Sequence, residues 1–169
     1  MGDVVRMVVV MGVSGSGKTA VGRALARRLA IPFHDADDHH PPGNVAKMSR
    51  GEPLSDADRG PWLDALRALV TAALGDGRAV LACSALARRY RERIGTGRAG
   101  VRLVFLDGPP DLIRARIGAR RDHFMPASLL DSQLAALERP AADERPVVVS
   151  IEDDPETIAA RIAAAIDAP

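Results

Sequence analysis

A parallel α/β sheet of five strands, with helices on both faces, is the fold class that the sequence predicts, on two observations. Short, nearly unbroken apolar runs alternate along the chain with longer stretches of helical periodicity. Strands joined by helical crossovers form a parallel sheet, because each crossover returns the chain to the same edge. The 169 residues fit one domain, 1–169, which is large enough to bury a core without metal or disulfide support.

The expected elements follow in order. The first strand is expected at 4–11, a short β-branched run, and the first helix at 18–29, where Val21, Leu25 and Leu29 recur every fourth position. Pro61 and Pro155 are placed in the first turns of later helices, where a missing N–H breaks no helical hydrogen bond. The remaining strands are expected at 31–35, 79–83, 101–106 and 147–151, and the remaining helices at 61–74, 87–94, 110–117, 127–137 and 155–166.

The turn between the first strand and the first helix is a complete match to the phosphate-binding pattern G-x-x-x-x-G-K-[ST]. In such a loop, backbone N–H groups and the positive end of the helix surround a phosphate. Lys18 is expected to reach the β- and γ-phosphates of a nucleotide, and the Thr19 hydroxyl to bind Mg²⁺. The matching residues are Gly12, Val13, Ser14, Gly15, Ser16, Gly17, Lys18 and Thr19.

Two further observations bear on this loop. Lys18 and Lys47 are the only lysines among 23 basic residues, which indicates that a compact point charge is needed at position 18. Residues 15–20 also satisfy the weaker dinucleotide-binding pattern G-x-G-x-x-A, with an acidic residue near the distance expected for ribose binding. That alternative explains neither the lysine nor the threonine.

Composition restricts the possible partners and location. The formal net charge is +1 and aromatic residues make up 3%, so neither an electrostatic nor a base-stacking case for nucleic acid exists. The single cysteine excludes an internal disulfide framework and fits a reducing compartment. The N-terminal apolar run is far shorter than a membrane span. The expected location is the cytoplasm, with no membrane partner.

Acidic and histidine side chains gather where the second strand ends, in the stretch His-Asp-Ala-Asp-Asp-His-His-Pro-Pro at 34–42. Ligands of an open α/β sheet lie at the carboxyl ends of its strands. Asp35 and Asp37 face the same side of an extended chain, and phosphoryl transfer needs one group near Mg²⁺ and another near the attacking hydroxyl. A solvated acidic turn and a transition-metal site built from the histidines and aspartates are the alternatives.

Beyond these local patterns, the chain resembles the gluconokinase family over nearly its whole length and in order. The similar segments are Gly12–Thr19, Asp35–Pro41, Asn44–Met48, Gly51–Leu63, Cys83–Leu86 with Tyr90-Arg91, His123-Phe124-Met125, and Leu137–Pro140 with Asp143-Glu144. The resemblance implies a fold like that of shikimate and nucleoside-monophosphate kinases, with a mobile lid. It also implies transfer of the ATP γ-phosphate to the 6-hydroxyl of D-gluconate, with Mg²⁺ as cofactor.

The substrate gluconate is a small anion rich in hydroxyls, so its pocket should offer an arginine fork and short polar groups. Arg59 is expected to bind the carboxylate by analogy with shikimate kinase, although a surface ion pair with Asp56 or Asp58 is the alternative. The other expected substrate contacts are His40, Lys47, Ser84 and Arg88. The family commonly has lysine where Ala87 stands, so any such role would shift to Arg88.

Two apolar side chains near this pocket have ordinary explanations. Trp62, the single tryptophan, is interpreted as a core anchor rather than a wall for the sugar. Cys83 is interpreted as a small buried hydrophobe, because only Arg88 and Arg89 lie nearby in sequence to activate a thiol.

A second basic cluster, Arg116, Arg120, Arg121 and His123, is expected to lie in the lid, at about 116–126. An arginine arriving from a lid can neutralise the transferring phosphoryl group and exclude water. Arg120 is assigned to the phosphate, Arg116 to the adenine and His123 to the substrate. A solvated basic helix end is the alternative.

The resulting prediction is an ATP-dependent gluconokinase with its acceptor-binding segment at about 36–60. Asp37 is expected to orient the 6-hydroxyl and Asp35 to hold Mg²⁺ through water, and the exchanged assignment of the two carboxylates is the alternative. Another small-molecule kinase of this fold, or a nucleotide-binding switch without turnover, is the alternative. A homodimer is possible, because dimers are common among members of the family that the chain resembles.

Overall fold

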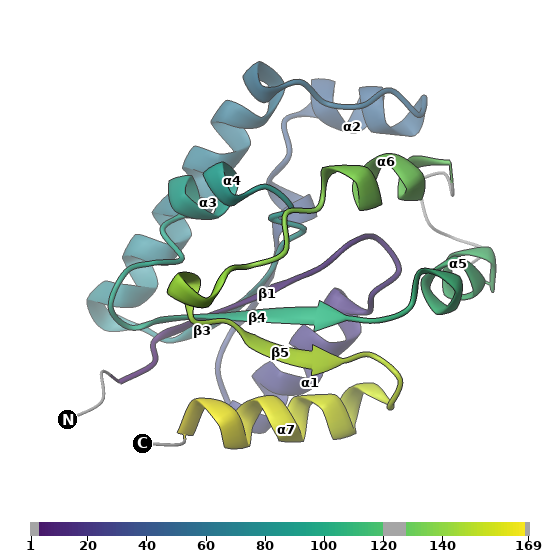
Figure 1. Ribbon diagram of the computed structural model, residues 1–169. Helices are drawn as coiled ribbons and strands as arrows, with labels where there is room; N and C mark the ends of the chain where they lie inside the picture. The colour runs from purple at the N-terminus through teal and green to yellow at the C-terminus, as the bar shows by residue number, and fades with distance from the viewer. Residues whose placement is uncertain (1–3, 120–127, 168–169) are drawn as a thin grey trace.

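The computed structural model of the protein describes residues 4–119 and 128–167. Five parallel strands form one sheet in the order β2-β3-β1-β4-β5. The bounds of the strands are β1 Met7–Met11, β2 Phe33–Asp35, β3 Ala79–Ala82, β4 Val101–Asp107 and β5 Val147–Ser150. All five strands therefore end at the same edge of the sheet, and β1 lies at its centre (Figure 1).

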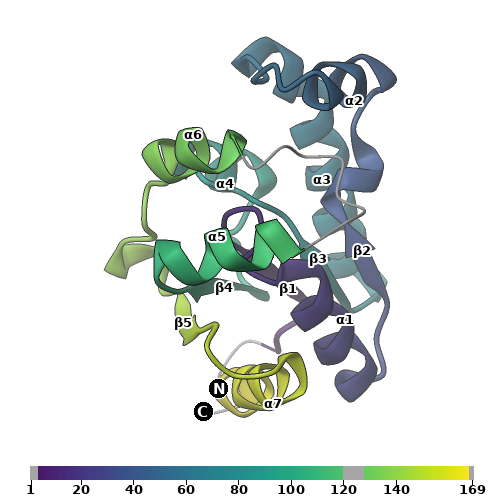
Figure 2. The same ribbon diagram turned by 90° about the vertical axis from the view of Figure 1, so that its right-hand side faces the viewer.

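Helices cover both faces of this sheet, as Figures 1 and 2 show. The α-helices are α1 Lys18–Leu29, α2 Pro42–Ser49, α3 Asp56–Asp76, α4 Arg88–Ile94, α5 Pro110–Ala119, α6 Leu129–Ala136 and α7 Pro155–Asp167. Two short 3-10 helices, η1 Ala36–His39 and η2 Ala142–Glu144, complete the elements. Below the sheet in Figure 1, α1 and α7 lie side by side, and α3 and α4 lie above it.

Alternate residues of the central strand belong to two separate cores. Val8 and Val10 of β1 pack among residues of α1 and α7, whereas Met7, Val9 and Met11 pack among residues of α3. Side chains of a strand alternate between faces, so a continuously apolar strand needs helices on both sides. This is the physical reason why the unbroken apolar run predicts a buried central strand.

The sequence prediction of five parallel strands with helices on both faces is confirmed. The expected helices are present in the structure, and the strand ends differ from expectation by three residues or fewer. One helix was not expected: α2 lies between residues 35 and 61, where the sequence predicted neither a helix nor a strand. The predicted lid, at about 116–126, falls mostly outside the described residues.

The prediction that Pro61 lies in the first turn of its helix is wrong. Helix α3 begins at Asp56, five residues earlier, and Pro61 lies inside it. The start is fixed by a capping box, in which the Ser55 hydroxyl accepts a hydrogen bond from the Asp58 N–H at 3.1 Å. The Asp58 carboxylate in turn accepts from the Ser55 N–H at 2.9 Å. These two bonds stabilise the first turn, although the proline ring removes one helical hydrogen bond.

A buried ion pair holds the β3–α4 connection in place. The Arg91 guanidinium donates to both Glu144 carboxylate oxygens, at 2.7 and 3.0 Å, and to the carbonyls of Ala85 and Leu86, each at 3.0 Å. The exposed fractions of the Arg91 and Glu144 side chains are 1% and 10%. Ala85 has a φ of +45°, which a residue with a Cβ adopts only when neighbours enforce it. Arg91 therefore fixes the turn that carries Ser84 toward the site.

Replacing Arg91 by methionine should lower the free energy of unfolding by about 3–5 kcal/mol, because the Glu144 carboxylate stays buried without its partner. The measurement is chemical denaturation of the wild type and the variant. The double variant Arg91→Met/Glu144→Leu should recover part of the loss, since no buried charge then remains unpaired. A loss below about 1 kcal/mol in the single variant, the level of an exposed ion pair, would contradict this account.

Candidate active site

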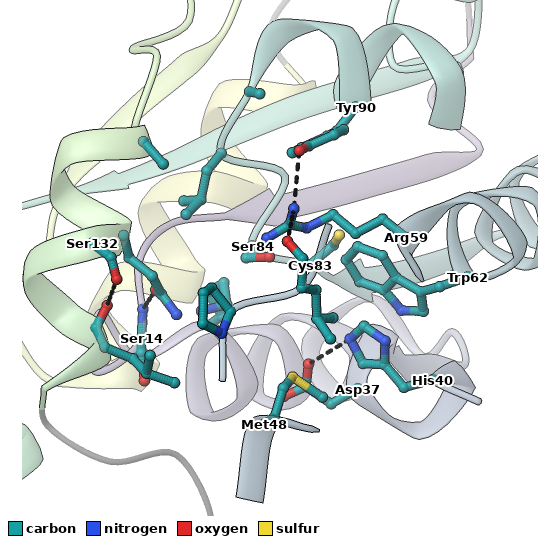
Figure 3. Close-up of a pocket in the computed structure, with 18 of the residues that line it drawn as sticks. Ser14, Asp37, His40, Met48, Arg59, Trp62, Cys83, Ser84, Tyr90 and Ser132 are labelled. Carbon is teal, nitrogen blue, oxygen red and sulfur yellow. Dashed lines mark hydrogen bonds and ion pairs between the residues drawn. The ribbon is translucent and has the colours of Figure 1, made fainter. Parts of the chain in front are cut away.

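One cavity of about 580 Å³ opens at the carboxyl ends of the strands. It is lined by the phosphate loop, the end of β2, the first turn of α3, the β3–α4 turn and α6, and Figure 3 shows a close-up of it. The sequence-predicted residues that line it are Ser14, Gly15, Gly17, Lys18, Thr19, Asp35, Asp37, His40, Arg59 and Ser84. This volume lies within the range of small-molecule sites.

The phosphate loop connects β1 to the N-terminus of α1. Gly15 and Gly17 have φ angles of +81° and +94°, which favour glycine, and a Cβ on Gly15 would lie 2.6 Å from Ile117 Cγ1. The Ser16 hydroxyl is buried without a hydrogen-bond partner among the described residues. Lys18 Nζ donates to the Val13 carbonyl at 3.1 Å. A tight glycine turn at a helix N-terminus, with a buried unpaired hydroxyl and an ammonium group, fits an anion of phosphate type.

Helix α6 closes one side of this loop. The side-chain oxygen of Gln133 accepts a hydrogen bond from the Ser14 N–H at 2.7 Å. Ser14 and Ser132 lie on the same side of the cavity, as Figure 3 shows. No pattern in the sequence indicates Gln133, because its contact with Ser14 joins residues 119 positions apart.

Oxygen groups suited to Mg²⁺ lie beside the loop. The Thr19 hydroxyl donates to Asp35 Oδ2 at 2.8 Å, and Asp35 Oδ1 accepts the Asp37 N–H at 3.1 Å, which caps η1. Mg²⁺ prefers oxygen ligands and keeps several waters. A hydroxyl and a carboxylate in contact at the edge of a phosphate site therefore fit the ion.

Asp37, His40 and Trp62 lie side by side in the cavity, with the imidazole between the carboxylate and the indole (Figure 3). His40 Nε2 lies 4.0 Å from Asp37 Oδ1, and the imidazole stacks on the Trp62 indole with ring centroids 4.2 Å apart. Burial, reinforced by the positive charge of Arg59, lowers the pKa of His40 to about 4. His40 is therefore neutral at physiological pH. Trp62 is buried in the core and also lines the cavity, so the interpretation as a core anchor covers only part of its role.

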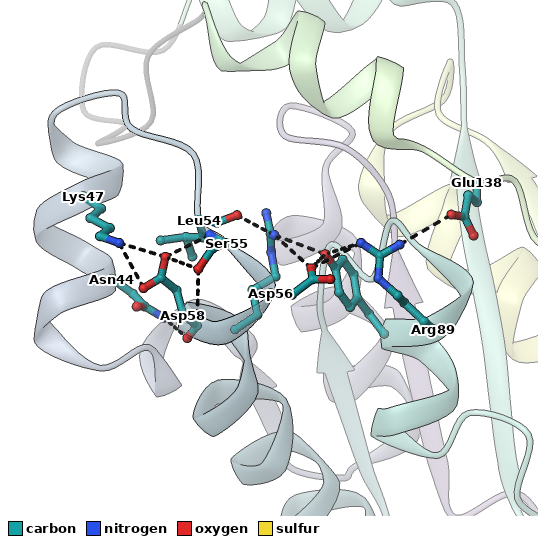
Figure 4. A network of polar contacts seen from close by, with 10 residues as sticks. Asn44, Lys47, Leu54, Ser55, Asp56, Asp58, Arg89 and Glu138 are labelled. Atoms are coloured by element: carbon teal, nitrogen blue, oxygen red, sulfur yellow. Dashed lines mark hydrogen bonds and ion pairs between the residues drawn. The ribbon is translucent and has the colours of Figure 1, made fainter.

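Arg59, in the first turn of α3, lines the cavity. Its guanidinium belongs to a polar network around Asp56, which Figure 4 shows. Its Nη1 donates to the Leu54 carbonyl at 2.6 Å and to the Tyr90 hydroxyl at 3.1 Å, and lies 3.8 Å from Asp56 Oδ1. Tyr90 donates to the same Asp56 oxygen. The ion pair with Asp56 that was the alternative exists, but it does not remove Arg59 from the cavity. Since both hydrogen bonds leave from Nη1, other N–H donors of the guanidinium remain for a ligand.

Arg89 also lines the cavity, although the sequence did not predict a role for it in the site. Its guanidinium donates to Asp56 Oδ1 at 3.2 Å and lies 4.6 Å from the centroid of the Tyr90 ring. It also lies 3.9 Å from Glu138 Oε1. Tyr90, the single tyrosine of the chain, and Asp56 both belong to segments shared with gluconokinases, but nothing in the sequence indicated that they contact each other.

Three residues that were predicted to contact substrate or nucleotide form other contacts outside the cavity lining. Lys47 Nζ donates to both Asp58 carboxylate oxygens at 3.0 and 2.9 Å, and with the Ser55 bonds this lowers the pKa of Asp58 to about 2. Arg88 pairs with Asp143, at 2.6 and 3.2 Å. Arg116 donates to the Ile151 carbonyl in the β5–α7 loop at 2.6 Å. The structure brings none of the three into the cavity lining, so their roles remain predictions.

The remaining predicted residues divide between the cavity and the undescribed segment. Ser84 lines the cavity. Cys83 is buried, and burial raises the pKa of its thiol to about 12, which confirms the interpretation as an inert hydrophobe. The predicted lid residues Arg120, Arg121 and His123 lie outside the described residues.

The alternative of a transition-metal site finds no support in the geometry. The His34 and His39 rings are 6.5 Å apart, and within residues 4–119 and 128–167 no three histidine, cysteine or acidic side chains converge as metal ligands. No helix in the described part of the chain has the length and apolar character to cross a membrane.

A phosphate loop at the end of the central strand, facing a polar pocket for a small acceptor, defines the chain as a P-loop kinase. The comparisons with known proteins agree with this class. The profile of the shikimate kinase family matches residues 14–167. The shikimate kinase of Aquifex aeolicus superimposes with a TM-score of 0.59 at 17% identity, over 95% of this chain and 96% of that one, which shows the shared fold.

Closer relatives identify the family. The chain is 49% identical to a gluconokinase of Gluconobacter oxydans, covering 94% of this chain and 89% of that protein. It is 46% identical to the thermosensitive gluconokinase of Escherichia coli, covering 83% and 75%. A gluconokinase structure from Sinorhizobium meliloti superimposes with a TM-score of 0.83 at 41% identity, covering 95% and 90%. The chain belongs to the gluconokinase family, which leaves the dinucleotide-binding alternative without support.

Proposed function

We propose that this protein transfers the γ-phosphate of ATP to the 6-hydroxyl of D-gluconate. The proposal rests on one observation: the phosphate loop, Asp37 and Arg59 all line the same cavity. ATP is the co-substrate that the kinase family implies. The gluconate assignment rests on the relatives named above and on two side chains of the cavity. Arg59 can bind the carboxylate of a sugar acid, and Asp37 can accept a hydrogen bond from its 6-hydroxyl.

On the nucleotide side, the chain acts by position and charge. Lys18 and the N–H groups of the loop hold the β- and γ-phosphates at the N-terminus of α1. The transition state spreads negative charge over the equatorial phosphoryl oxygens, so fixed positive groups lower its free energy. Lys18 gives up its contact with the Val13 carbonyl for the phosphate.

Mg²⁺ is proposed as the cofactor, held by the Thr19 hydroxyl and, through water, by Asp35. When bound, the ion neutralises charge on the β- and γ-phosphates. Asp35 also orients its neighbours, because its two oxygens accept from Thr19 and from the Asp37 N–H.

On the acceptor side, Arg59 binds the gluconate carboxylate and Asp37 orients the attacking hydroxyl. Proton transfer is late in a loose phosphoryl transfer, so Asp37 acts chiefly through orientation and accepts the proton secondarily. Ser84 and His40 supply further polar contacts to the polyol from the β3–α4 turn and the cavity floor.

The other sequence predictions are retained as proposals. Lys47, Arg88 and His123 are proposed to contact the acceptor, Arg116 the adenine and Arg120 the transferring phosphate. The protein is proposed to work in the cytoplasm, without nucleic acid, and a homodimer is a further possibility for its assembly.

The experiment that tests the proposal is ATP turnover, measured as ADP release, with D-gluconate, its epimers or shikimate as acceptor. We expect strong stimulation by D-gluconate and little by shikimate. Turnover that no sugar acid stimulates would favour a nucleotide-binding switch, and stimulation by shikimate instead would assign a different acceptor.

Replacing Arg59 by lysine should raise the KM for gluconate by roughly 10- to 100-fold while the KM for ATP stays nearly constant, because charge is kept but the bidentate fork is lost. The measurement is steady-state kinetics with each substrate varied.

Arg93→Lys is the matched control for this variant. Arg93 forms a comparable fork with the Asp64 carboxylate, at 2.9 Å for both bonds, but does not line the cavity. We expect its kinetics to equal those of the wild type. Gluconate dependence that Arg59→Lys leaves unchanged would refute the carboxylate assignment.

A further inference from the structure

Asn44 is a buried polar residue next to the site that does not line the cavity. Its exposed fraction is 5%, and it lies in the first turn of α2. A polar side chain at this depth needs hydrogen-bond partners. Asn44 Nδ2 has two such partners, the Asp58 carbonyl and His40 Nδ1. Together they determine which ring nitrogen of His40 carries the proton.

The first partner fixes the orientation of the amide. Asn44 Nδ2 donates to the Asp58 backbone carbonyl at 2.9 Å (Figure 4). A carbonyl oxygen only accepts hydrogen bonds, so the nitrogen of the amide, and not its oxygen, must face Asp58. The opposite orientation would place two acceptors against each other.

The second hydrogen of the same nitrogen then faces His40. Asn44 Nδ2 lies 3.3 Å from His40 Nδ1. Because the amide nitrogen is a donor, Nδ1 must be the acceptor, and in a neutral imidazole the proton then resides on Nε2. Within the described residues, the side chains with a recorded interaction with this ring are Asp37, Arg59, Asn44 and Trp62, and burial beside Arg59 keeps the ring neutral.

The imidazole is held rigidly in this orientation. It lies nearly parallel to the Trp62 indole, with an interplanar angle of 14°. The indole is itself fixed, because Trp62 Nε1 donates to the Ala36 carbonyl at 2.7 Å. The Nε2–H of His40 is thereby directed toward Asp37, on the cavity side.

The separation of His40 Nε2 and Asp37 Oδ1, 4.0 Å, is too long for a direct hydrogen bond. One oxygen atom at a hydrogen-bond distance of about 2.8 Å from both atoms fits between them. A hydroxyl is both donor and acceptor, so it can donate to Asp37 while it accepts from Nε2–H.

We propose that Asn44 is a positioning residue that sets His40 as the Nε2–H tautomer, so that His40 and Asp37 together bind one hydroxyl of the acceptor. A tautomer with the proton on Nδ1 would present two acceptors to that hydroxyl, which has one hydrogen. The identity of the acceptor rests on the proposed function, whereas the tautomer is a property of the protein alone.

The direct test is ¹⁵N NMR of the histidine rings in the substrate-free protein, with the His40 signals assigned by their loss in His40→Gln. We expect the proton on Nε2 and an unprotonated Nδ1. A proton on Nδ1 of neutral His40 would overturn the proposal. This result does not depend on whether gluconate is the substrate, so failure of the proposed function would be seen separately, in the turnover assay.

The variant Asn44→Asp tests the consequence for the reaction. An aspartate accepts and does not donate, so Nδ1 must then carry a proton, and the neutral ring loses Nε2–H. We expect kcat/KM for gluconate to fall roughly 10- to 100-fold above the pKa of His40 in this variant, with little change in the KM for ATP. Lowering the pH through that pKa should restore part of the loss, because the imidazolium donates from both nitrogens.

His40→Gln is the control background, because its amide has a fixed donor and no tautomer to set. Adding Asn44→Asp to His40→Gln should change kcat/KM for gluconate less than about threefold, while thermal unfolding reports any general damage to α2. An equal loss in both backgrounds would mean that Asn44 acts only through the fold, and the proposal would be wrong.

Discussion

Lys18→Ala should reduce kcat by roughly 100- to 1,000-fold or more while the thermal unfolding temperature stays close to that of the wild type. The ammonium donates to the Val13 carbonyl within the phosphate loop, where the proposed contact with the nucleotide phosphates would be made. The measurement is kcat from ADP release, with thermal unfolding of the same preparation.

The chain offers a matched control for this variant in its other lysine. Lys47 pairs with Asp58 outside the cavity lining and is proposed to contact only the acceptor, so Lys47→Ala should lower kcat far less than Lys18→Ala and act mainly on the KM for gluconate. A loss of stability in Lys18→Ala that accounts for the loss of activity would make Lys18 a structural residue.

Asp37→Asn should reduce kcat by about 100- to 10,000-fold, the range for a group that orients a nucleophile and accepts its proton. The substitution preserves size and one acceptor oxygen but removes the charge. ATP should still bind, because the phosphates are held by the loop and not by Asp37. The measurements are kcat by steady-state kinetics and ATP affinity by calorimetry.

Asp35→Asn is the control that separates the two carboxylates. Its defect should be partly relieved by more Mg²⁺, because Asp35 contacts the Thr19 hydroxyl at the proposed ion site. If Asp35→Asn gives the substrate-specific defect and Asp37→Asn the metal-sensitive one, the two roles must be exchanged.

Much of the fold was predictable because its signals are local. An unbroken apolar strand between two helical faces can be recognised within a few residues, as Met7–Met11 illustrates. Helix α2 was missed because it is only eight residues long and contains Gly43, a poor helix former. The early start of α3 depends on the reciprocal bonds of Ser55 and Asp58, and these outweigh the signal from Pro61.

The site, like the fold, could be predicted only where its sequence signals are local. The phosphate loop follows from a contiguous pattern, and the pairing of Asp35 with Thr19 follows from the strand end that carries it. The network of Tyr90, Asp56 and Arg89 joins residues more than thirty positions apart, and no spacing in the sequence predicts it. The sequence likewise could not show that Lys47 is paired with Asp58, because side-chain direction depends on the unpredicted helix α2.

In the proposed reaction, the γ-phosphate of ATP is transferred to the 6-hydroxyl of D-gluconate. The most direct measurement is NMR of the reaction mixture with ¹³C-labelled gluconate, Mg²⁺ and ATP, which identifies the phosphorylated carbon by its coupling to ³¹P. The account predicts ADP and a single product that carries phosphate on the oxygen of C6. Phosphate on another carbon, or ADP with inorganic phosphate and unchanged gluconate, would contradict it.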